Sequence, residues 1–249
     1  MNFKNRLLKY IISKIKITRY FYDRKKYPSY WYNFVALQLV NNNARILDIG
    51  CGIGTLLRHI SSSKHNYSLF GTDKSPRNIF LAKFLDFGKT INFCSSDIEN
   101  GLHFDKQSFD LCILNDVLHY IKDKKKLILE ISKILTKNGT LAFIHISNVR
   151  LGASPIFPIN YINLIKLLEK HGFEHIFAID DQDLWKRIIN NSTIDFNLNN
   201  LLKNKSPNIY TIFASRKKLQ KSITIPKKIY NQIKIQNPVF SGQFGNDMT

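Results

Sequence analysis

The chain has 249 residues, enough for one large domain or two small ones with a sizeable hydrophobic core. Its 37 basic and 18 acidic residues give a net charge of +19, which favours anionic partners such as nucleic acid, acidic lipid headgroups or acidic metabolites; a composition rich in Asn, Ile and Lys is the alternative source of that charge. Three cysteines exclude a disulfide scaffold and predict reduced thiols, and no run approaches the roughly 20 apolar residues of a membrane span.

The first 40 residues are expected to form a helical cap. Apolar residues recur at helical spacing from Phe3 to Ile15 with lysines between them, and a second helix is expected from near Pro28. We expect the apolar face of the first helix to cover the rest of the protein; the alternative is an amphipathic anchor on an anionic membrane. No secretory signal is visible, so the protein is expected to be cytoplasmic.

Apolar runs and amphipathic segments alternate through the middle of the chain. Strands are expected over 45–49, 67–72, 91–96, 109–114 and 140–147, and helices over 54–62, 75–88 and 123–135. The sequence Lys137-Asn138-Gly139 is expected to close the last of these helices as a C-cap. Because the strands are continuous apolar runs, they predict a parallel sheet that helices cover on both faces.

Fewer elements are expected in the C-terminal third. A helix from Tyr161 ends at Gly172, and two late strands over 173–180 and 208–217 can pair antiparallel, with a short helix, Leu184–Asn190, and an Asn-rich loop between them. The tail over 218–249 is expected to be partly disordered. These elements predict one domain over 41–217, flanked by the cap over 1–40 and by that basic tail.

The stretch ILDIGCGIGT, Ile46–Thr55, joins the first strand to a helix through three glycines. Ligands of doubly wound sheets lie beyond the carboxyl ends of the strands, so the loop over 50–54 is the expected binding site. The glycines leave its backbone bare where a ligand must approach. The dinucleotide pattern GxGxxG fails because Thr55 replaces the third glycine, and Asp48 would repel a pyrophosphate but attract an α-amino group.

Two further acids follow the next two strands. Asp73 can accept from both hydroxyls of a ribose, and Asp97, expected beside it, can accept from the exocyclic amine of a base. Together with Asp48, they match the amine, ribose and adenine of S-adenosylmethionine. The alternative for Asp73 and Asp97 is capping of the helix that follows each of them.

The segments ILDIGCGIGT, FGTDKS, CSSDIENG, FDLCILNDVLHYI and LTKNGTLAFI together resemble the class I S-adenosylmethionine-dependent methyltransferases, in particular the small-molecule group called type 11. The resemblance covers residues 44–146 and, more weakly, the two late strands. It implies an α/β, Rossmann-like fold: a doubly wound, mostly parallel sheet of seven strands, with the last strand inserted antiparallel.

The resemblance also assigns roles by position. Asp48 would hold the methionine amine beside the backbone of Gly50, and Asn115 would offer its carbonyl oxygen to the same amine. Asp73 would hold the ribose, and Asp97 with the backbone of Ile98 would meet the adenine edge. The other expected cofactor-binding positions are Cys51, Gly52, Gly54 and Lys74, with Ile53 as a further wall residue.

Methyl transfer from a sulfonium requires positioning, and a general base helps only where the acceptor must lose a proton. His119, just past the fourth strand, is the first candidate for that base, and His145, in the fifth strand, is the second; a structural role is the alternative for both. The sequence lacks the Asn/Asp-Pro-Pro-aromatic motif of base amino methyltransferases, a Pro-Cys pair, a GxSxG elbow and any metal-ligand cluster.

Three hypotheses about function remain open. The first is methylation of oxygen, nitrogen or carbon in a small molecule, a sugar or a lipid-linked intermediate. The second is methylation of tRNA or rRNA, favoured by the charge of +19 but disfavoured by lysines scattered along the chain. The third is an inactive S-adenosylmethionine-binding module. The choice of acceptor is expected to depend on the N-terminal helices, on residues 148–160 and on the insert around Trp185.

Overall fold

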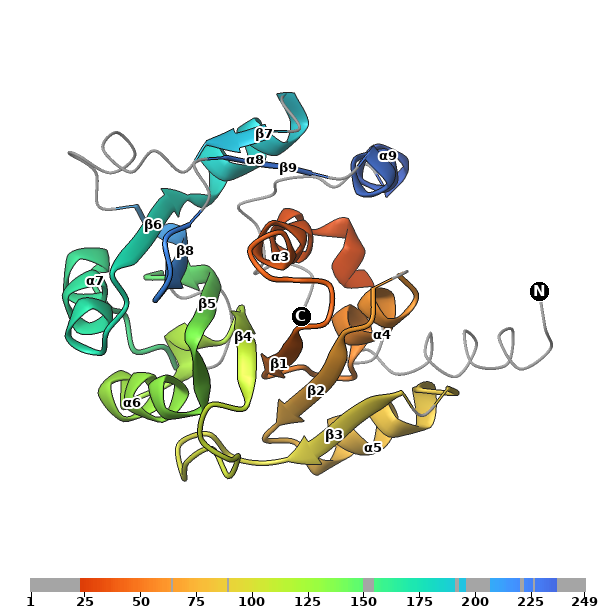
Figure 1. Cartoon of the computed structure of the whole chain (residues 1–249), viewed down its shortest axis with the longest axis horizontal. Helices are drawn as coiled ribbons and strands as arrows, with labels where there is room; N and C mark the ends of the chain where they lie inside the picture. Colours follow the sequence, from red (N-terminus) through yellow and green to blue (C-terminus); the bar gives the residue numbers. More distant parts are fainter. Residues whose placement is uncertain are drawn as a thin grey trace.

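A seven-stranded sheet crosses the protein in the order β3-β2-β1-β4-β5-β8-β6 (Figure 1). The strands are β1 (Arg45–Ile49), β2 (Ser68–Asp73), β3 (Ile91–Ser95), β4 (Phe109–Asn115), β5 (Leu135–Ser147), β6 (His175–Asp180) and β8 (Ile209–Ser215). The computed structural model describes residues 23–63, 65–88, 90–149, 155–190, 193–195, 207–219, 222–225 and 227–236. The predicted helix over the first residues of the chain lies outside this range.

The first five strands of the sheet are parallel, and β8 runs antiparallel between β5 and β6. Residues within one strand alternate between two apolar clusters: Ile46, Leu111 and Ile113 face one side, while Leu47, Cys112 and Leu114 face the other. This two-sided burial explains why the strands read as continuous apolar runs. The predicted seven-stranded α/β fold with an inserted antiparallel strand is confirmed.

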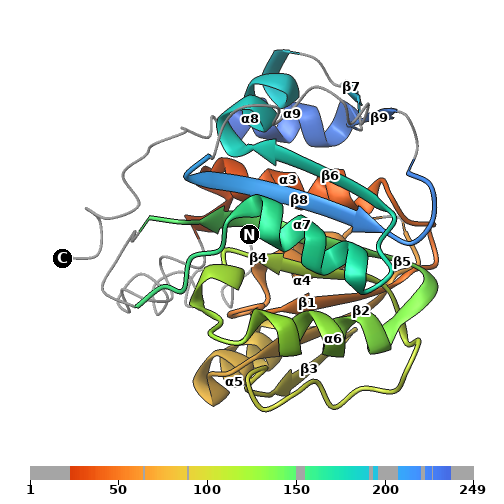
Figure 2. The same cartoon turned by 90° about the vertical axis from the view of Figure 1, so that its left-hand side faces the viewer.

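Helices cover both faces of the sheet. On one face lie α3 (Pro28–Leu37), α4 (Thr55–Ser61), α5 (Pro76–Leu85) and α8 (Asp181–Asn190), and on the other lie α6 (Lys124–Ile134) and α7 (Tyr161–Lys170), which Figure 2 shows side by side. Ser75, Asp123 and Asn160 cap α5, α6 and α7 through side-chain oxygens that accept backbone N–H bonds. None of the described helices is both long and apolar enough to cross a membrane.

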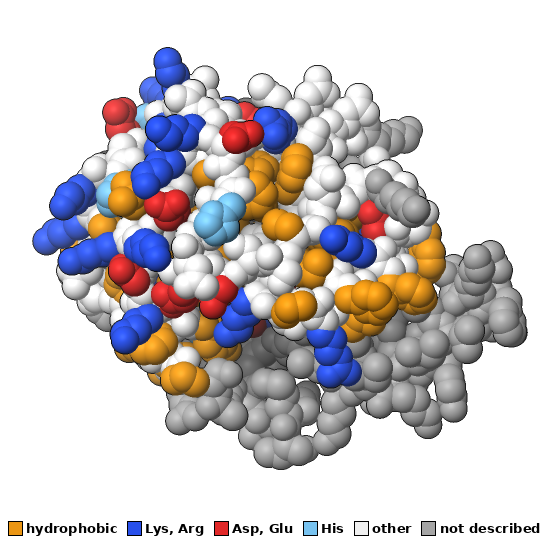
Figure 3. All heavy atoms as spheres, turned by 90° about the horizontal axis from the view of Figure 1, so that it is seen from below, with side chains coloured by type: hydrophobic (Ala, Val, Ile, Leu, Met, Phe, Trp, Pro, Cys, Tyr) orange, Lys and Arg blue, Asp and Glu red, His pale blue; other side chains and the backbone are white. Residues whose placement is uncertain are grey.

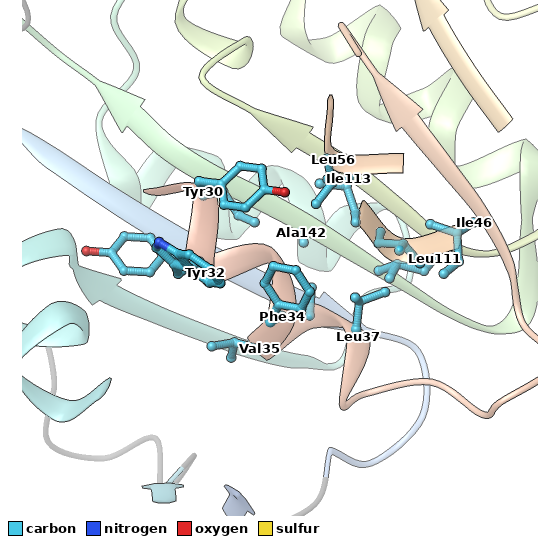
Figure 4. Packing of buried hydrophobic residues seen from close by; sticks show 14 of the residues in the cluster. Tyr30, Tyr32, Phe34, Val35, Leu37, Ile46, Leu56, Leu111, Ile113 and Ala142 are labelled. Carbon is cyan, nitrogen blue, oxygen red and sulfur yellow. The ribbon is translucent and has the colours of Figure 1, made fainter. Parts of the chain in front are cut away.

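The helix α3 is buried along its whole length. Tyr30, Phe34 and Val35 pack with Ile46 and Ile113 of the sheet in one cluster (Figure 4). The part of the predicted cap that the structure describes therefore shares its core with the sheet. This packing holds the residues just before α3, the 3-10 helix η1 (Asp23–Lys26), against the domain.

The junction between α6 and β5 differs from the expected one. The predicted C-cap at Lys137-Asn138-Gly139 is wrong: α6 ends at Ile134 and these residues belong to β5, which starts at Leu135. The pairing of β5 with β4 shifts register between Phe109 and Leu111, and this irregularity accommodates the extra length.

The structure also orders segments for which no element was predicted. Residues Thr193–Asp195 form β7 in the Asn-rich insert, and they pair antiparallel with β9, Ser222–Thr224, in the predicted tail. A helix, α9, follows over Lys227–Gln236. Ile223 and Ile233 from these tail elements are buried in the cluster that includes Trp185 of α8. Long-range burial of isolated isoleucines therefore orders this part of the tail, which local composition does not indicate.

Candidate functional site

A cavity of about 590 Å³ lies at the carboxyl ends of β1, β2 and β4. Its walls come from the glycine loop, the residues that follow β2 and β3, the end of β4 with the 3-10 helix η2 (Leu118–Tyr120), the segment from η1 to α3, and the chain after β5. This is the edge where doubly wound sheets bind ligands. The described residues include no group of three His, Cys, Asp or Glu that could hold a metal ion.

Another hollow, of about 530 Å³, lies around Asp110, Thr136 and Lys137. The Asp110 carboxylate accepts from Arg45 N at 2.9 Å and from Thr136 Oγ1 at 3.2 Å, so both of its oxygens already have partners. We therefore assign the ligand site to the cavity at the carboxyl ends of the strands.

The glycine loop takes a backbone path that side chains would obstruct. Gly50 and Gly54 have φ angles of +78° and +74°, and a Cβ atom on Gly50 would lie 2.4 Å from Cγ2 of Val117. The backbone N–H groups of Gly50 and Cys51 both donate to Thr72 O, at 2.7 and 3.0 Å. These bonds hold the loop against the end of β2, and Gly50 and Cys51 of the loop line the cavity.

Asp48 is the buried acid of the cavity. Asp48 is only 4% exposed and lines the cavity. Within the described residues its carboxylate accepts no hydrogen bond. Burial and the nearby Asp73 carboxylate raise its pKa to about 7, against an opposing effect of Arg24. A buried carboxylate without a partner is costly, and a ligand ammonium group would relieve that cost.

Asp73 is tightly bonded to the protein. Its Oδ2 accepts from Gly52 N at 2.9 Å, while Oδ1 accepts from Ser75 N at 2.9 Å and from Asn78 Nδ2 at 3.2 Å. A carboxylate has about four acceptor positions, so Oδ2 retains capacity for one more donor. Asp73 both fixes the glycine loop and lines the cavity.

The predicted adenine end of the site is more open. Asp97 is exposed, lines the cavity and accepts from Glu99 N at 3.0 Å through Oδ1. Ile98 is buried and lines the cavity beside it, and exposed Lys74 lies on the wall as well. Ile53 does not line the cavity: it packs beneath the loop against Leu85.

The end of β4 is bonded to a residue that the sequence analysis missed. Arg24, from η1, donates to Asp116 Oδ2 at 2.9 Å and to Asn115 Oδ1 at 3.1 Å, while Asn115 Nδ2 donates to Ser29 O at 2.9 Å. Burial opposes ionisation of Asp116, but Arg24, His145 and His119 outweigh it and hold its pKa below the usual range. No sequence signal distinguishes Arg24 from the other basic residues of the DRKK run.

His119 does not line the cavity. It is 1% exposed, its Nδ1 accepts from Ser147 N at 3.3 Å, and its Nε2 lies 3.5 Å from Asp116 Oδ1. Burial lowers its pKa to about 4 despite the Asp116 charge, so the ring is neutral at pH 7 with its proton on Nε2. The role of His119 as general base stays a prediction. In that role Nδ1 would have to accept the proton of the acceptor, which requires that the hydrogen bond from Ser147 N to Nδ1 breaks.

His145 belongs to a buried polar cluster. Its Nδ1 lies 2.7 Å from Asp181 Oδ2, Thr211 Oγ1 donates to Asp181 Oδ1 at 2.7 Å, and Tyr32 OH donates to Asp181 O at 2.6 Å. Burial disfavours the imidazolium, but the bond to Asp181 outweighs it and raises the pKa of His145. His145 also has a φ of +58° at the irregularity of β5, and it is not on the cavity wall.

One side of the cavity is apolar. Tyr120 and Ile121 contribute from η2 and its end, and Pro155 and Phe157 contribute from the chain that follows β5. The Phe157 N–H donates to His119 O at 2.8 Å, which joins this chain to η2. This wall belongs to the segment 148–160 that was predicted to influence acceptor choice.

The charge of the cavity is opposite in sign to that of the whole chain. Its charged lining residues are the acids Asp48, Asp73, Asp97, Glu99 and Asp116 and the bases Arg24 and Lys74. Five acids against two bases, in a chain of net charge +19, mark a site suited to a cationic ligand.

Comparison with known proteins agrees with this geometry. Residues 40–193 match the family described as methyltransferase domain, which is more than half of the chain. The phthiotriol/phenolphthiotriol dimycocerosates methyltransferase of Mycobacterium leprae is 30% identical over 112 residues, 45% of this chain and 41% of that protein. The ubiquinone biosynthesis O-methyltransferase of Pelagibacter ubique is 31% identical over 99 residues, 40% of either chain. The chain thus spans less than half the length of these curated relatives.

The fold also occurs in solved structures. Phosphoethanolamine N-methyltransferase 2 of Haemonchus contortus, in complex with S-adenosyl-L-methionine, superimposes with a TM-score of 0.55 at 18% identity. The similarity covers 74% of this chain and 51% of that one. At this identity the comparison supports the fold alone.

Proposed function

The chain belongs to the class I S-adenosylmethionine-dependent methyltransferases, and from that premise we propose that it methylates a small, largely apolar acceptor, either a metabolite or a lipid-linked intermediate. The acceptor atom is an oxygen, a nitrogen or a carbon. The excess of acids over bases on the cavity wall is the observation that carries the proposal, because it suits a cationic cofactor and disfavours a polyanionic acceptor.

The residues present fit the cofactor. The buried Asp48 carboxylate, which has no hydrogen bond within the described residues, would hold the ammonium group, with the carbonyl oxygen of Asn115 as a second acceptor. Asp73 would accept from a ribose hydroxyl through Oδ2, because Oδ1 already has two donors. Asp97 and the backbone of Ile98 would meet the adenine edge, and the Arg24 guanidinium would meet the cofactor carboxylate.

The glycine loop and a charged wall residue would complete this binding site. Gly50 and Cys51 would bring bare backbone to the ligand, while Gly52 and Gly54 shape the loop, and Lys74 would cover the open side. Gly52 N also fixes the Asp73 carboxylate.

S-Adenosylmethionine, when bound, supplies a methyl group already activated on a sulfonium. The chain's own contribution is to position the acceptor and to keep water away from it. Tyr120, Pro155 and Phe157 form an apolar wall that suits this task, and the hydrogen bond from Phe157 N to His119 O holds the wall in place. His119, the predicted base, lies beneath the wall with its Nε2 3.5 Å from Asp116 Oδ1, and it would act on an acceptor only after its Nδ1 leaves the Ser147 N–H.

The nature of the wall supports the choice of acceptor. Apolar side chains bind apolar or amphiphilic molecules in proportion to the area that they cover. The names of two relatives, a phthiotriol/phenolphthiotriol dimycocerosates methyltransferase and a ubiquinone biosynthesis O-methyltransferase, point to acceptors of the same character. Methylation of RNA is the second candidate, favoured by the net charge of +19 and opposed by the acids that line the cavity.

The cofactor assignment is tested by calorimetric titration. S-Adenosylmethionine is titrated into the wild type, into Asp73→Ala and into Asp105→Ala, an exposed acid outside the cavity that serves as a matched control. We expect binding that Asp73→Ala weakens at least tenfold and Asp105→Ala leaves intact. Binding of NADH without binding of S-adenosylmethionine would overturn the assignment.

The acceptor assignment is tested with S-adenosylmethionine that carries a tritiated methyl group. The enzyme is incubated separately with a total lipid extract, with water-soluble metabolites and with total RNA. Label in the lipid or metabolite fraction supports the proposal, and label confined to RNA refutes it. Cofactor binding without label in any fraction identifies an inactive binding module.

The predicted base is tested with His119→Gln. A base role predicts reduced turnover with unchanged cofactor affinity. Unchanged turnover rejects that role.

A further inference from the structure

The helix α5 is apolar on two opposite sides. Ile79, Ala82 and Leu85 are buried against the sheet, as one helix face requires. Phe80 and Phe84 stand on the other side of the helix and are 67% and 57% exposed. An amphipathic helix of a soluble domain would carry polar residues at these positions.

A third phenylalanine extends the outer stripe. Phe87, in the turn after α5, is 62% exposed, and the spacing of Phe80, Phe84 and Phe87 is that of one helix face. These three are the most exposed large hydrophobic side chains among the described residues. Isolated apolar residues on a surface are ordinary, but three large apolar side chains that adjoin on one helix face indicate a contact surface. We name Phe80, Phe84 and Phe87 the phenylalanine stripe.

Positive charge borders the phenylalanine stripe. On a helical projection, Arg77 lies to one side of it and Lys83 to the other, and both residues are exposed. The helix, with the sequence PRNIFLAKFL, contains no acid, and the acid that follows it, Asp86, is buried with its carboxylate bonded to Ile91 N. Figure 3 shows the side of the molecule on which α5 lies in Figure 1, where hydrophobic side chains gather beside Lys and Arg side chains.

We propose that the phenylalanine stripe, with Arg77 and Lys83 at its borders, docks the protein on the surface of an anionic lipid bilayer. Aromatic side chains on a convex helix face enter the boundary between headgroups and acyl chains, and flanking cations pair with anionic headgroups. These residues are not those of the N-terminal helix, for which a membrane contact was the alternative prediction. The inference does not depend on which acceptor is methylated.

The size and charge of the surface favour a bilayer over other occupants. Three phenylalanines that are about three-fifths exposed present roughly 400 Å² of apolar area, less than the ~800 Å² that each partner of a stable protein dimer buries. Nucleic acid would require a continuous basic surface, whereas the exposed side of α5 carries only two cations, Arg77 and Lys83, beside the phenylalanine stripe.

The phenylalanine stripe lies next to the rim of the cavity. Ser75, the N-cap of α5, and Asn78 in its first turn both line the cavity. The phenylalanine stripe begins at Phe80, within a turn of these residues. A protein docked through α5 would hold the rim of its cavity close to the bilayer surface.

The test is sedimentation of the full-length protein with vesicles. The vesicles are made of phosphatidylcholine alone or of phosphatidylcholine with 30% phosphatidylglycerol. The stripe variant is Phe80→Ser/Phe84→Ser/Phe87→Ser, and its matched control, Leu129→Ser/Ile162→Ser/Ile189→Ser, removes three exposed apolar side chains elsewhere. We expect the wild type and the control to bind anionic vesicles and the stripe variant to bind at least tenfold more weakly.

Charge is tested separately with Arg77→Gln/Lys83→Gln, which should weaken binding to anionic vesicles and reduce its dependence on salt. Calorimetric binding of S-adenosylmethionine should be equal in all variants, because none of the substituted side chains lines the cavity; this readout shows that each variant is folded and tests the cofactor site independently. The proposal is overturned if the wild type fails to bind anionic vesicles or if the stripe variant binds like the wild type. It is equally overturned if the stripe proves to hold a dimer, seen as a fall in mass by light scattering in the variant, or to bind RNA in preference to vesicles.

Discussion

Replacing the buried acid Asp48 by Asn should make the protein more stable and bind its cofactor less well. In the absence of cofactor the Asp48 carboxylate is buried beside Asp73, and its pKa is raised from 3.8 to about 7. An acid whose pKa is raised on folding costs stability when it ionises. That cost begins near pH 4, where the unfolded carboxyl ionises, and reaches its full value above about pH 7.

The structure sets the size of the effect. The difference between 3.8 and about 7, at roughly 1.4 kcal/mol for each pH unit, gives a ceiling of about 4 kcal/mol above pH 7. For a chain of this length 1 kcal/mol moves the melting temperature by about 2–4 °C, so the ceiling for Asp48→Asn is a gain of roughly 8–16 °C. The gain should vanish near pH 4, because both the carboxyl group and the amide are then neutral.

Two measurements check the prediction. Melting temperatures of the cofactor-free wild type, Asp48→Asn and the exposed control Asp105→Asn are compared from pH 4 to pH 8.5. Calorimetry at pH 7.5 should show a 10- to 100-fold weaker affinity of Asp48→Asn for S-adenosylmethionine, the loss of roughly one charge-assisted hydrogen bond. For the wild type, titration in two buffers of different ionisation enthalpy should reveal proton release on binding, because the cofactor ammonium favours the ionised carboxylate.

Two outcomes would refute this reasoning. If cofactor-free Asp48→Asn melts below the wild type at pH 8, the Asp48 carboxylate is already compensated within the protein. If its affinity for the cofactor matches that of the wild type, the ammonium group is held elsewhere. Asp105→Asn should behave like the wild type in both measurements.

Three further substitutions probe the site and the core. Gly50→Ala should abolish cofactor binding and lower stability by about 1–3 kcal/mol, because its Cβ would lie 2.4 Å from Val117 Cγ2 at a φ of +78°; wild-type affinity, measured by calorimetry, would contradict this. Asp73→Asn should weaken the binding of S-adenosylmethionine less than Asp73→Ala does in the same titration, because the amide oxygen of Asn can still accept from the backbone donors. His145→Ala should cost about 3–5 kcal/mol in urea unfolding at pH 6, because it removes the charged partner of the buried Asp181 carboxylate and leaves it, among the described residues, only the Thr211 hydroxyl as a side-chain donor. Since the folded pKa of His145 is raised, the stabilisation by this pair should be greatest below about pH 6.5 and decline as pH rises through the folded pKa; a loss independent of pH would show that the ring is neutral throughout.

The fold and most of the residues that line the candidate cofactor site could be predicted from local sequence. Continuous apolar strands, helix caps such as Ser75 and glycines with positive φ are properties of short segments. The carboxyl ends of parallel strands meet at one edge of the sheet, so the order of strands and helices already places Asp48, Asp73 and Asp97 on one cavity.

What the sequence by itself determined is therefore the α/β class, the glycine loop and the acids at the strand ends, because each follows from short-range patterns. Only the tertiary structure decided that Arg24 meets Asp116, 92 residues away, and that Ser147 N–H takes the Nδ1 lone pair of His119. It also decided which side of α5 is left uncovered by the sheet. These outcomes depend on which distant segments come into contact, and the residues themselves carry no local signal of their eventual partners.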